Sequence, residues 1–165
     1  MKATYRLSWT RRATLGGLLL FALSLPSSPA RGRDVLSVDQ PPAAKARKGQ
    51  SLDVPLRARL QPGYHVNSND PREEFMIPLK LTWAAAPLEV EAVEYPEPAM
   101  ERYSFTDDPL AVFTGDFDIR TRFRVPDQAP AGGHNLRGSL RYQACSDKLC
   151  LPPKTIPVSL TVSVE

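Results

Sequence analysis

The chain has 165 residues, of which 42% are hydrophobic, 24% charged and 8% aromatic, and its formal net charge is +3. This length supports one domain with a hydrophobic core but not two large domains. The 17 prolines disfavour a bundle of long helices, and no apolar run reaches the roughly 20 residues of a membrane span, which excludes a polytopic membrane protein.

The first 30 residues are typical of a secretory signal peptide. Residues 1–30 contain four basic residues and no acidic one. All four basic residues precede an apolar stretch from Ala13 to Leu25. Ser28-Pro29-Ala30 then has the small-x-small pattern of a cleavage site. We predict a signal peptide over residues 1–30 and a mature domain over residues 31–165, with an uncleaved anchor as the alternative.

Removal of the signal peptide changes the charge of the protein. Residues 1–30 hold four of the 21 basic residues and none of the 18 acidic ones, so the mature chain has a net charge near −1. A near-neutral domain lacks the electrostatic footprint of a nucleic-acid-binding protein. We therefore expect no nucleic-acid partner.

Alternation of apolar and polar residues predicts a chain of half-buried strands. In chain order, weak alternation at residues 35–38 is followed by clear alternation at 51–60, weak alternation at 75–83 and 88–94, and clear alternation at 116–125, 135–144 and 155–164. Turn-forming residues cluster between these segments. About seven short strands with frequent turns indicate an all-β fold, an immunoglobulin-like antiparallel β-sandwich.

Cys145 and Cys150 are the only two cysteines, and they lie between the last two predicted strands. Thiols outside the cytoplasm tend to be oxidised, so this spacing suggests that the two form a disulfide with each other. Closing a loop of about six residues contributes only about 2 kcal/mol to stability. An exposed bond in a small polar loop is better suited to opening and closing by thiolate attack.

Two other interpretations of the cysteine pair stay open. The bond could be a structural loop disulfide in a non-catalytic binding or scaffold module. Two thiolates could also bind Cu(I) or zinc, although His65 and His134 are remote in sequence from them. We assign His65 to a surface turn, outside the active site, and the absence of a G-x-S-x-G motif disfavours a hydrolase.

The cysteine segment carries a family resemblance. Tyr142-Gln-Ala-Cys145 and Cys150-Leu-Pro-Pro, with the following Thr-Ile-Pro-Val-Ser-Leu strand, resemble the N-terminal periplasmic domain of the thiol:disulfide interchange protein DsbD. The segment from Pro62 to Asn69 (PGYHVNSN), with Ile77-Pro78, is similar to an early strand and turn of the same family. The resemblance extends over about residues 35–163.

This resemblance implies a periplasmic electron carrier. Its cysteine pair would take electrons from a thioredoxin-like protein or a membrane disulfide reductase. It would pass them to a periplasmic disulfide isomerase or a cytochrome-maturation thioredoxin, without a bound cofactor. By position, Cys150 would form mixed disulfides with partners and Cys145 would resolve them. We expect a stand-alone copy that receives its electrons from a separate protein.

The resemblance also implies a cap over the disulfide. In the family, a loop with an aromatic residue covers the bond and moves aside for a partner. The matching stretch from Val112 to Gly115 makes Phe113 the expected cap residue, with an ordinary core phenylalanine as the alternative. Tyr142, which flanks the pair, is the second expected contact, although alternation turns its side chain inward.

Overall fold

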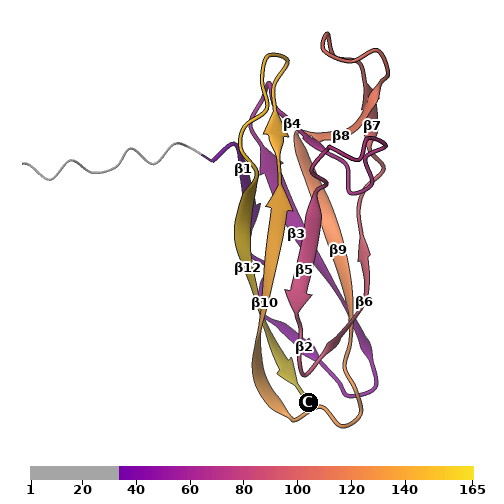
Figure 1. The fold of residues 1–165 in the computed structure, drawn as a ribbon. Coiled ribbons are helices and arrows are strands. Elements are labelled where there is room, and N and C mark those ends of the chain that lie inside the picture. Colours follow the sequence, from indigo (N-terminus) through magenta and orange to yellow (C-terminus); the bar gives the residue numbers. More distant parts are fainter. Residues whose placement is uncertain (1–33) are drawn as a thin grey trace, which may run out of the picture. The chain divides into compact units, whose positions relative to one another are not determined.

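The computed structural model describes residues 34–165, and every regular element in this range is a β-strand (Figure 1). The signal peptide predicted at residues 1–30 lies outside the described residues. Within residues 34–165 there is no helix with the length and hydropathy needed to cross a membrane. The expected all-β fold is confirmed.

Over residues 34–165, twelve strands form three four-stranded sheets. The first sheet has the order β1 (Leu36–Asp39), β3 (Ser51–Leu60), β9 (Asp116–Arg124), β6 (Glu89–Glu94). The second has the order β2 (Ala44–Ala46), β12 (Lys154–Val164), β10 (Gly132–Tyr142), β5 (Lys80–Ala84). The third has the order β11 (Ala144–Cys145), β4 (His65–Asn67), β8 (Leu110–Thr114), β7 (Ala99–Glu101). Neighbouring strands are antiparallel except β2 and β12, which are parallel.

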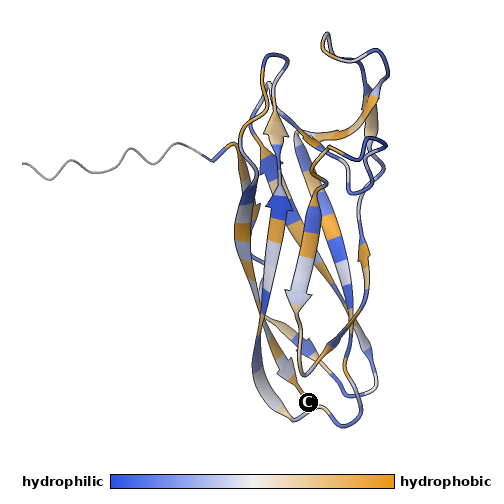
Figure 2. Ribbon diagram, viewed as in Figure 1, coloured by the Kyte–Doolittle hydropathy of each residue, from blue (hydrophilic) through white to orange (hydrophobic). Residues whose placement is uncertain are grey.

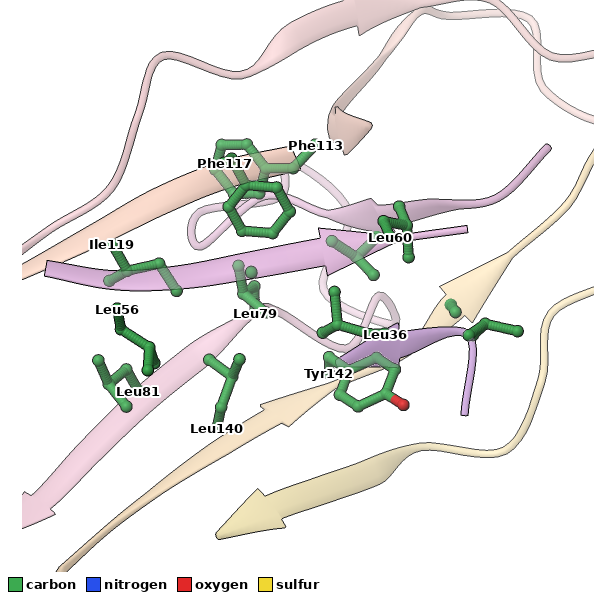
Figure 3. Packing of buried hydrophobic residues seen from close by; sticks show 14 of the residues in the cluster. Leu36, Leu56, Leu60, Leu79, Leu81, Phe113, Phe117, Ile119, Leu140 and Tyr142 are labelled. Carbon is green, nitrogen blue, oxygen red and sulfur yellow. The ribbon is translucent and has the colours of Figure 1, made fainter. Parts of the chain in front are cut away.

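The alternating faces of the strands build the core of the sandwich. Figure 2 shows the alternation as hydrophobic and hydrophilic bands along β9. One face of each long strand packs inward, and all three sheets contribute to one buried cluster, with Leu56 and Ile119 from the first, Leu140 from the second and Phe113 from the third (Figure 3). On the outer face of the first sheet, arginines and aspartates pair across strands, as Arg59 does with Asp39. The sandwich is therefore held by its apolar faces.

The strands predicted from long alternations of apolar and polar residues agree with the structure. Predictions for shorter segments are less accurate, because a short strand shows too little alternation. The clear segments correspond to β3, β9, β10 and β12. The strand predicted at residues 75–83 is wrong in its first half, because only Lys80–Ala84 is extended in β5. The assignment of His65 to a surface turn is also wrong, since this residue is buried in β4. A strand of three residues is too short to show alternation.

Candidate functional site

The cysteine pair lies at one end of the sandwich. Cys145 is the last residue of β11, and Cys150 lies in the connection between β11 and β12. Cys145 and Cys150 form a disulfide, and the two residues face each other as an antiparallel bridge with a Cα–Cα distance of 3.9 Å. This distance is shorter than the range of about 4.4–6.8 Å that disulfides usually span. The residues are so close because they occupy directly opposed positions of a tight hairpin.

Hydrogen bonds of the hairpin itself hold this turn closed. The Ser146 amide donates to the Leu149 carbonyl oxygen over 2.9 Å, and the Leu149 amide donates to the Ser146 hydroxyl over 3.2 Å. Behind the cysteines, the Leu151 amide donates to the Ala144 carbonyl oxygen over 2.8 Å. The two cysteine positions are thus kept together by the backbone as well as by the covalent bond.

The two cysteines differ in exposure. Cys145 is only 3% exposed, whereas Cys150 is an exposed residue at the rim of the hairpin. A partner that approaches from solvent therefore meets Cys150 first. Since thiol–disulfide exchange requires an incoming thiolate to reach the sulfur it attacks, the geometry favours Cys150 as the sulfur that reacts with partners.

An apolar groove of about 380 Å³ opens beside the disulfide. Its rim carries Phe75 from the β4–β5 connection, 79% exposed, and Phe105 from the β7–β8 connection, 50% exposed. The residues that line it include both cysteines, Phe75, Phe105, His65 and Asn67. A contiguous exposed apolar surface of this kind is typical of a site that contacts another protein.

A column of three rings leads from β4 to the rim of this groove. The Tyr103 ring stacks on His65 with 4.1 Å between the centroids, and Phe105 in turn stacks on Tyr103 with a centroid separation of 5.4 Å. The Tyr103 hydroxyl donates a hydrogen bond of 2.6 Å to the Glu101 carboxylate. The stack anchors the β7–β8 connection, residues 102–109, over the outer face of the third sheet.

Comparison with known protein families identifies the family of this chain. The family model described as "Thiol:disulfide interchange protein DsbD, N-terminal" matches residues 33–161. The chain belongs to this family. The expectation drawn from the cysteine segment is therefore confirmed, and the cysteine pair is that of a DsbD N-terminal-like domain.

Solved structures resemble this DsbD N-terminal-like domain at low sequence identity. The N-terminal periplasmic domain of ScsB from Proteus mirabilis has a TM-score of 0.57 and 18% identity, covering 84% of this chain and 49% of that one. The DsbD N-terminal domain of Neisseria meningitidis, in reduced form, has a TM-score of 0.45 and 15% identity, covering 67% and 77%. The chain thus spans about half the length of the ScsB structure. No curated protein matches the sequence.

The structure of this DsbD N-terminal-like domain does not bring Phe113 or Tyr142 to the groove. Phe113 is 4% exposed and packs against Phe117, with 5.1 Å between the ring centroids, and Tyr142 is fully buried in the same cluster (Figure 3). The register explains the position of Phe113, because it pairs with Val66, which faces the core, whereas the neighbouring Thr114 pairs with His65 on the outer face.

Sequence reasoning missed two groups beside the disulfide, Phe105 and His65. The signal for Phe105 was available, since Tyr103 and Phe105 are two aromatic residues in a turn-rich segment that has no apolar alternation to bury them. No comparable signal in the sequence pointed to His65. Its position depends on the pairing of β4 with β11, which sets His65 directly opposite Cys145. Within residues 34–165 no cluster of three or more metal-ligating side chains is present.

Burial determines the protonation of the ring column. Removal from water lowers the pKa of His65 below its ordinary value, and the nearby Glu101 carboxylate opposes this shift only in part. Burial and the bond to Glu101 raise the pKa of the Tyr103 hydroxyl. At neutral pH His65 is therefore an uncharged imidazole and Tyr103 a hydrogen-bond donor.

The buried imidazole predicts a loss of stability on acidification. The unfolded chain takes up a proton at His65 near pH 6.5, and the folded chain does so only at a lower pH. Between these two values the unfolded state binds more protons, so the free energy of unfolding should decrease as the pH falls from about 7 through this window. Urea unfolding at stepped pH measures the slope. An equal slope in the His65→Gln variant would show that burial of His65 is not its cause.

Proposed function

We propose that this DsbD N-terminal-like domain is a periplasmic thiol–disulfide exchange module. It passes electrons from a thioredoxin-like donor or a membrane disulfide reductase to periplasmic acceptors such as a disulfide isomerase or a cytochrome-maturation thioredoxin. The observation that carries the proposal is the asymmetric disulfide, in which an exposed Cys150 opens onto an apolar groove and a buried Cys145 lies behind it.

The exchange is a pair of thiolate attacks. A thiolate of the donor attacks Cys150 Sγ, which forms an intermolecular disulfide and releases Cys145 as a thiolate that takes up a proton. The second donor thiolate then attacks the donor sulfur of that bond, which releases Cys150 and leaves the donor oxidised by two electrons. Delivery to an acceptor disulfide runs in the reverse sense, with Cys150 as the attacking sulfur and Cys145 as the sulfur that resolves.

The hairpin is suited to repeated opening of its disulfide. The hydrogen bonds between Ser146 and Leu149 and between Leu151 and Ala144 do not involve the sulfur atoms. They can hold the turn when the bond is reduced, so that Cys145 stays opposite Cys150 at high effective concentration. A covalent bond that adds little to such a hairpin is more useful for chemistry than for stability.

The aromatic rim supports a cover and a docking surface for partners. Phe105 stacks on Tyr103 and lines the groove that contains both cysteines, which supports Phe105, in place of Phe113, as the aromatic residue of the cover. We propose the β7–β8 connection, residues 102–109, as the movable cover. Phe75 and Leu149, which are both exposed, extend the apolar surface that a partner would contact once the cover moves.

The reduction potential tests the proposed function. Equilibration in thiol–disulfide buffers, with the two redox forms separated after alkylation, should give a value above about −300 mV, as expected for a bond that exchanges. A purified thioredoxin should reduce the oxidised domain with a stoichiometry of one disulfide. A potential well below that value, with no transfer from thioredoxin, would instead favour a binding or scaffold module that has a structural disulfide.

A further inference from the structure

We propose that His65 is the proton acceptor for Cys145 when this cysteine resolves a mixed disulfide held on Cys150. The inference rests on the exchange function proposed above and adds to it a group outside the cysteine pair. It starts from the pairing of β11 with β4, in which Cys145 and His65 are directly opposed residues. Side chains in such a pair lie on the same face of the sheet, with their Cβ atoms about 5 Å apart.

The surroundings of His65 support this assignment. His65 lines the groove together with Cys145 and Cys150, and it also lines a second cavity of about 540 Å³, to which Tyr103 contributes. The second cavity is also lined by the carboxylate residues Asp147 and Glu101. His65 therefore borders both the groove beside the resolving cysteine and a second, open cavity through which a proton can reach water.

The ring column keeps the imidazole in place. The Tyr103 ring stacks on it, and the hydroxyl of Tyr103 is fixed by Glu101. The titratable groups around His65 are Glu101 from β7, Tyr103 from the β7–β8 connection, Asp147 from the cysteine hairpin, Tyr64 next to it in the chain, and the two cysteines. Because burial lowers the pKa of His65, its neutral form is present at neutral pH and is able to accept a proton.

The proposed step balances in atoms and electrons. In the mixed disulfide, Cys150 is bonded to the partner sulfur and Cys145 is a thiol. The Cys145 proton passes to the neutral imidazole, the new thiolate attacks Cys150 Sγ, and the bond between Cys150 and the partner breaks. The partner sulfur leaves as a thiolate and takes a proton from the His65 imidazolium or from water. The cysteine pair is oxidised, and the partner has been reduced by two electrons in all.

The test uses the small aromatic disulfide dithiobis(nitrobenzoate) to separate the attack by Cys150 on the reagent from the attack by Cys145 on the resulting mixed disulfide. Each attack releases one coloured thiolate. In the reduced protein, the first release reports attack by Cys150 and depends on reagent concentration. The second release is intramolecular, reports resolution by Cys145 and is independent of reagent concentration. In the His65→Gln variant we expect the second rate at about pH 7 to fall by about tenfold or more, with the first nearly unchanged.

The pH dependence distinguishes proton transfer from a structural effect. In the wild type, the rate of the second release should vary little between about pH 6.5 and 8, whereas in the variant it should rise nearly tenfold per pH unit towards the ordinary pKa of a thiol. His134→Gln is the matched control, because His134 bonds to the Pro130 carbonyl oxygen and lies near the start of β10, whose other end at Tyr142 leads to the cysteine hairpin. A variant with the wild-type profile, or the same change in the control, would overturn the proposal.

A measurement on the unaltered protein covers the case in which the variant does not fold. The ring protons of His65 and His134 can be titrated by NMR in the oxidised and reduced forms. We expect the titration of His65 to change on reduction, because the Cys145 thiol then lies opposite it, and the His134 signals serve as the internal reference. Identical His65 curves in both forms contradict the proposal. Failure of the exchange function itself would appear differently, as a wild type that no thioredoxin reduces.

Discussion

A Cys145→Ala variant should accumulate a covalent mixed disulfide between Cys150 and a redox partner, and a Cys150→Ala variant should not. In the first variant the exposed thiol remains and the buried thiol that would release the partner is gone. In the second, the remaining thiol belongs to Cys145, which is only 3% exposed. We expect at least about tenfold more adduct with the first variant, because access of the partner sulfur limits the attack.

The experiment compares reduced forms of both variants after incubation with periplasmic extract. Non-reducing gels reveal the adducts, and the same samples run with reductant identify those held by a disulfide. Alkylation of each variant with a small maleimide is the control, since it reports the accessibility of the remaining thiol without any partner. Equal trapping by both variants would contradict the assignment of Cys150 as the attacking sulfur. Absence of any adduct in both would count against the exchange function.

Two phenylalanine variants should separate the core from the cover. Phe113→Ala should lower the free energy of unfolding by about 3–5 kcal/mol, because it leaves a cavity beside Phe117 in the core. That is a large part of the roughly 5–15 kcal/mol that stabilises a typical domain. Phe105→Ala removes a half-exposed ring and should cost about 1 kcal/mol or less.

The same pair should show the reverse order in reactivity. Loss of Phe105 uncovers one side of the disulfide groove, so dithiothreitol should reduce the oxidised Phe105→Ala variant several-fold faster than the wild type. Urea unfolding and quenched alkylation measure the two effects. If Phe113→Ala instead accelerated reduction while it retained wild-type stability, the cap would belong to Phe113, as the family resemblance had implied.

The long strands show what hydrophobic periodicity can predict. In β3, Val54, Leu56, Ala58 and Leu60 are buried and the residues between them are exposed, as the alternation in the sequence requires. β9 behaves in the same way. Nine to eleven residues are enough for a period of two to be recognised, and a strand with one apolar face has to bury that face. The sandwich and the disulfide hairpin could therefore be predicted without coordinates.

Hydrophobic periodicity and short motifs did not predict the orientation of the Phe113 side chain. Phe113 and Phe105 are both aromatic residues near the same turn cluster, and a resemblance of short motifs does not distinguish which of them covers the disulfide. Strand register explains the burial of Phe113, because its pairing with Val66 turns the ring into the core. A shift of one residue in β8 would have turned it outward.

The sequence by itself determined that this chain is a strand-rich domain with two cysteines spaced for a local disulfide, because side-chain alternation and cysteine spacing are properties of neighbouring residues. Only the tertiary structure decided which groups share the space around that bond. His65 and Cys145 are 80 residues apart in the sequence, and they become neighbours through the pairing of two very short strands, β4 and β11. Register between such strands depends on the whole packed sandwich, so it leaves no local pattern in the chain.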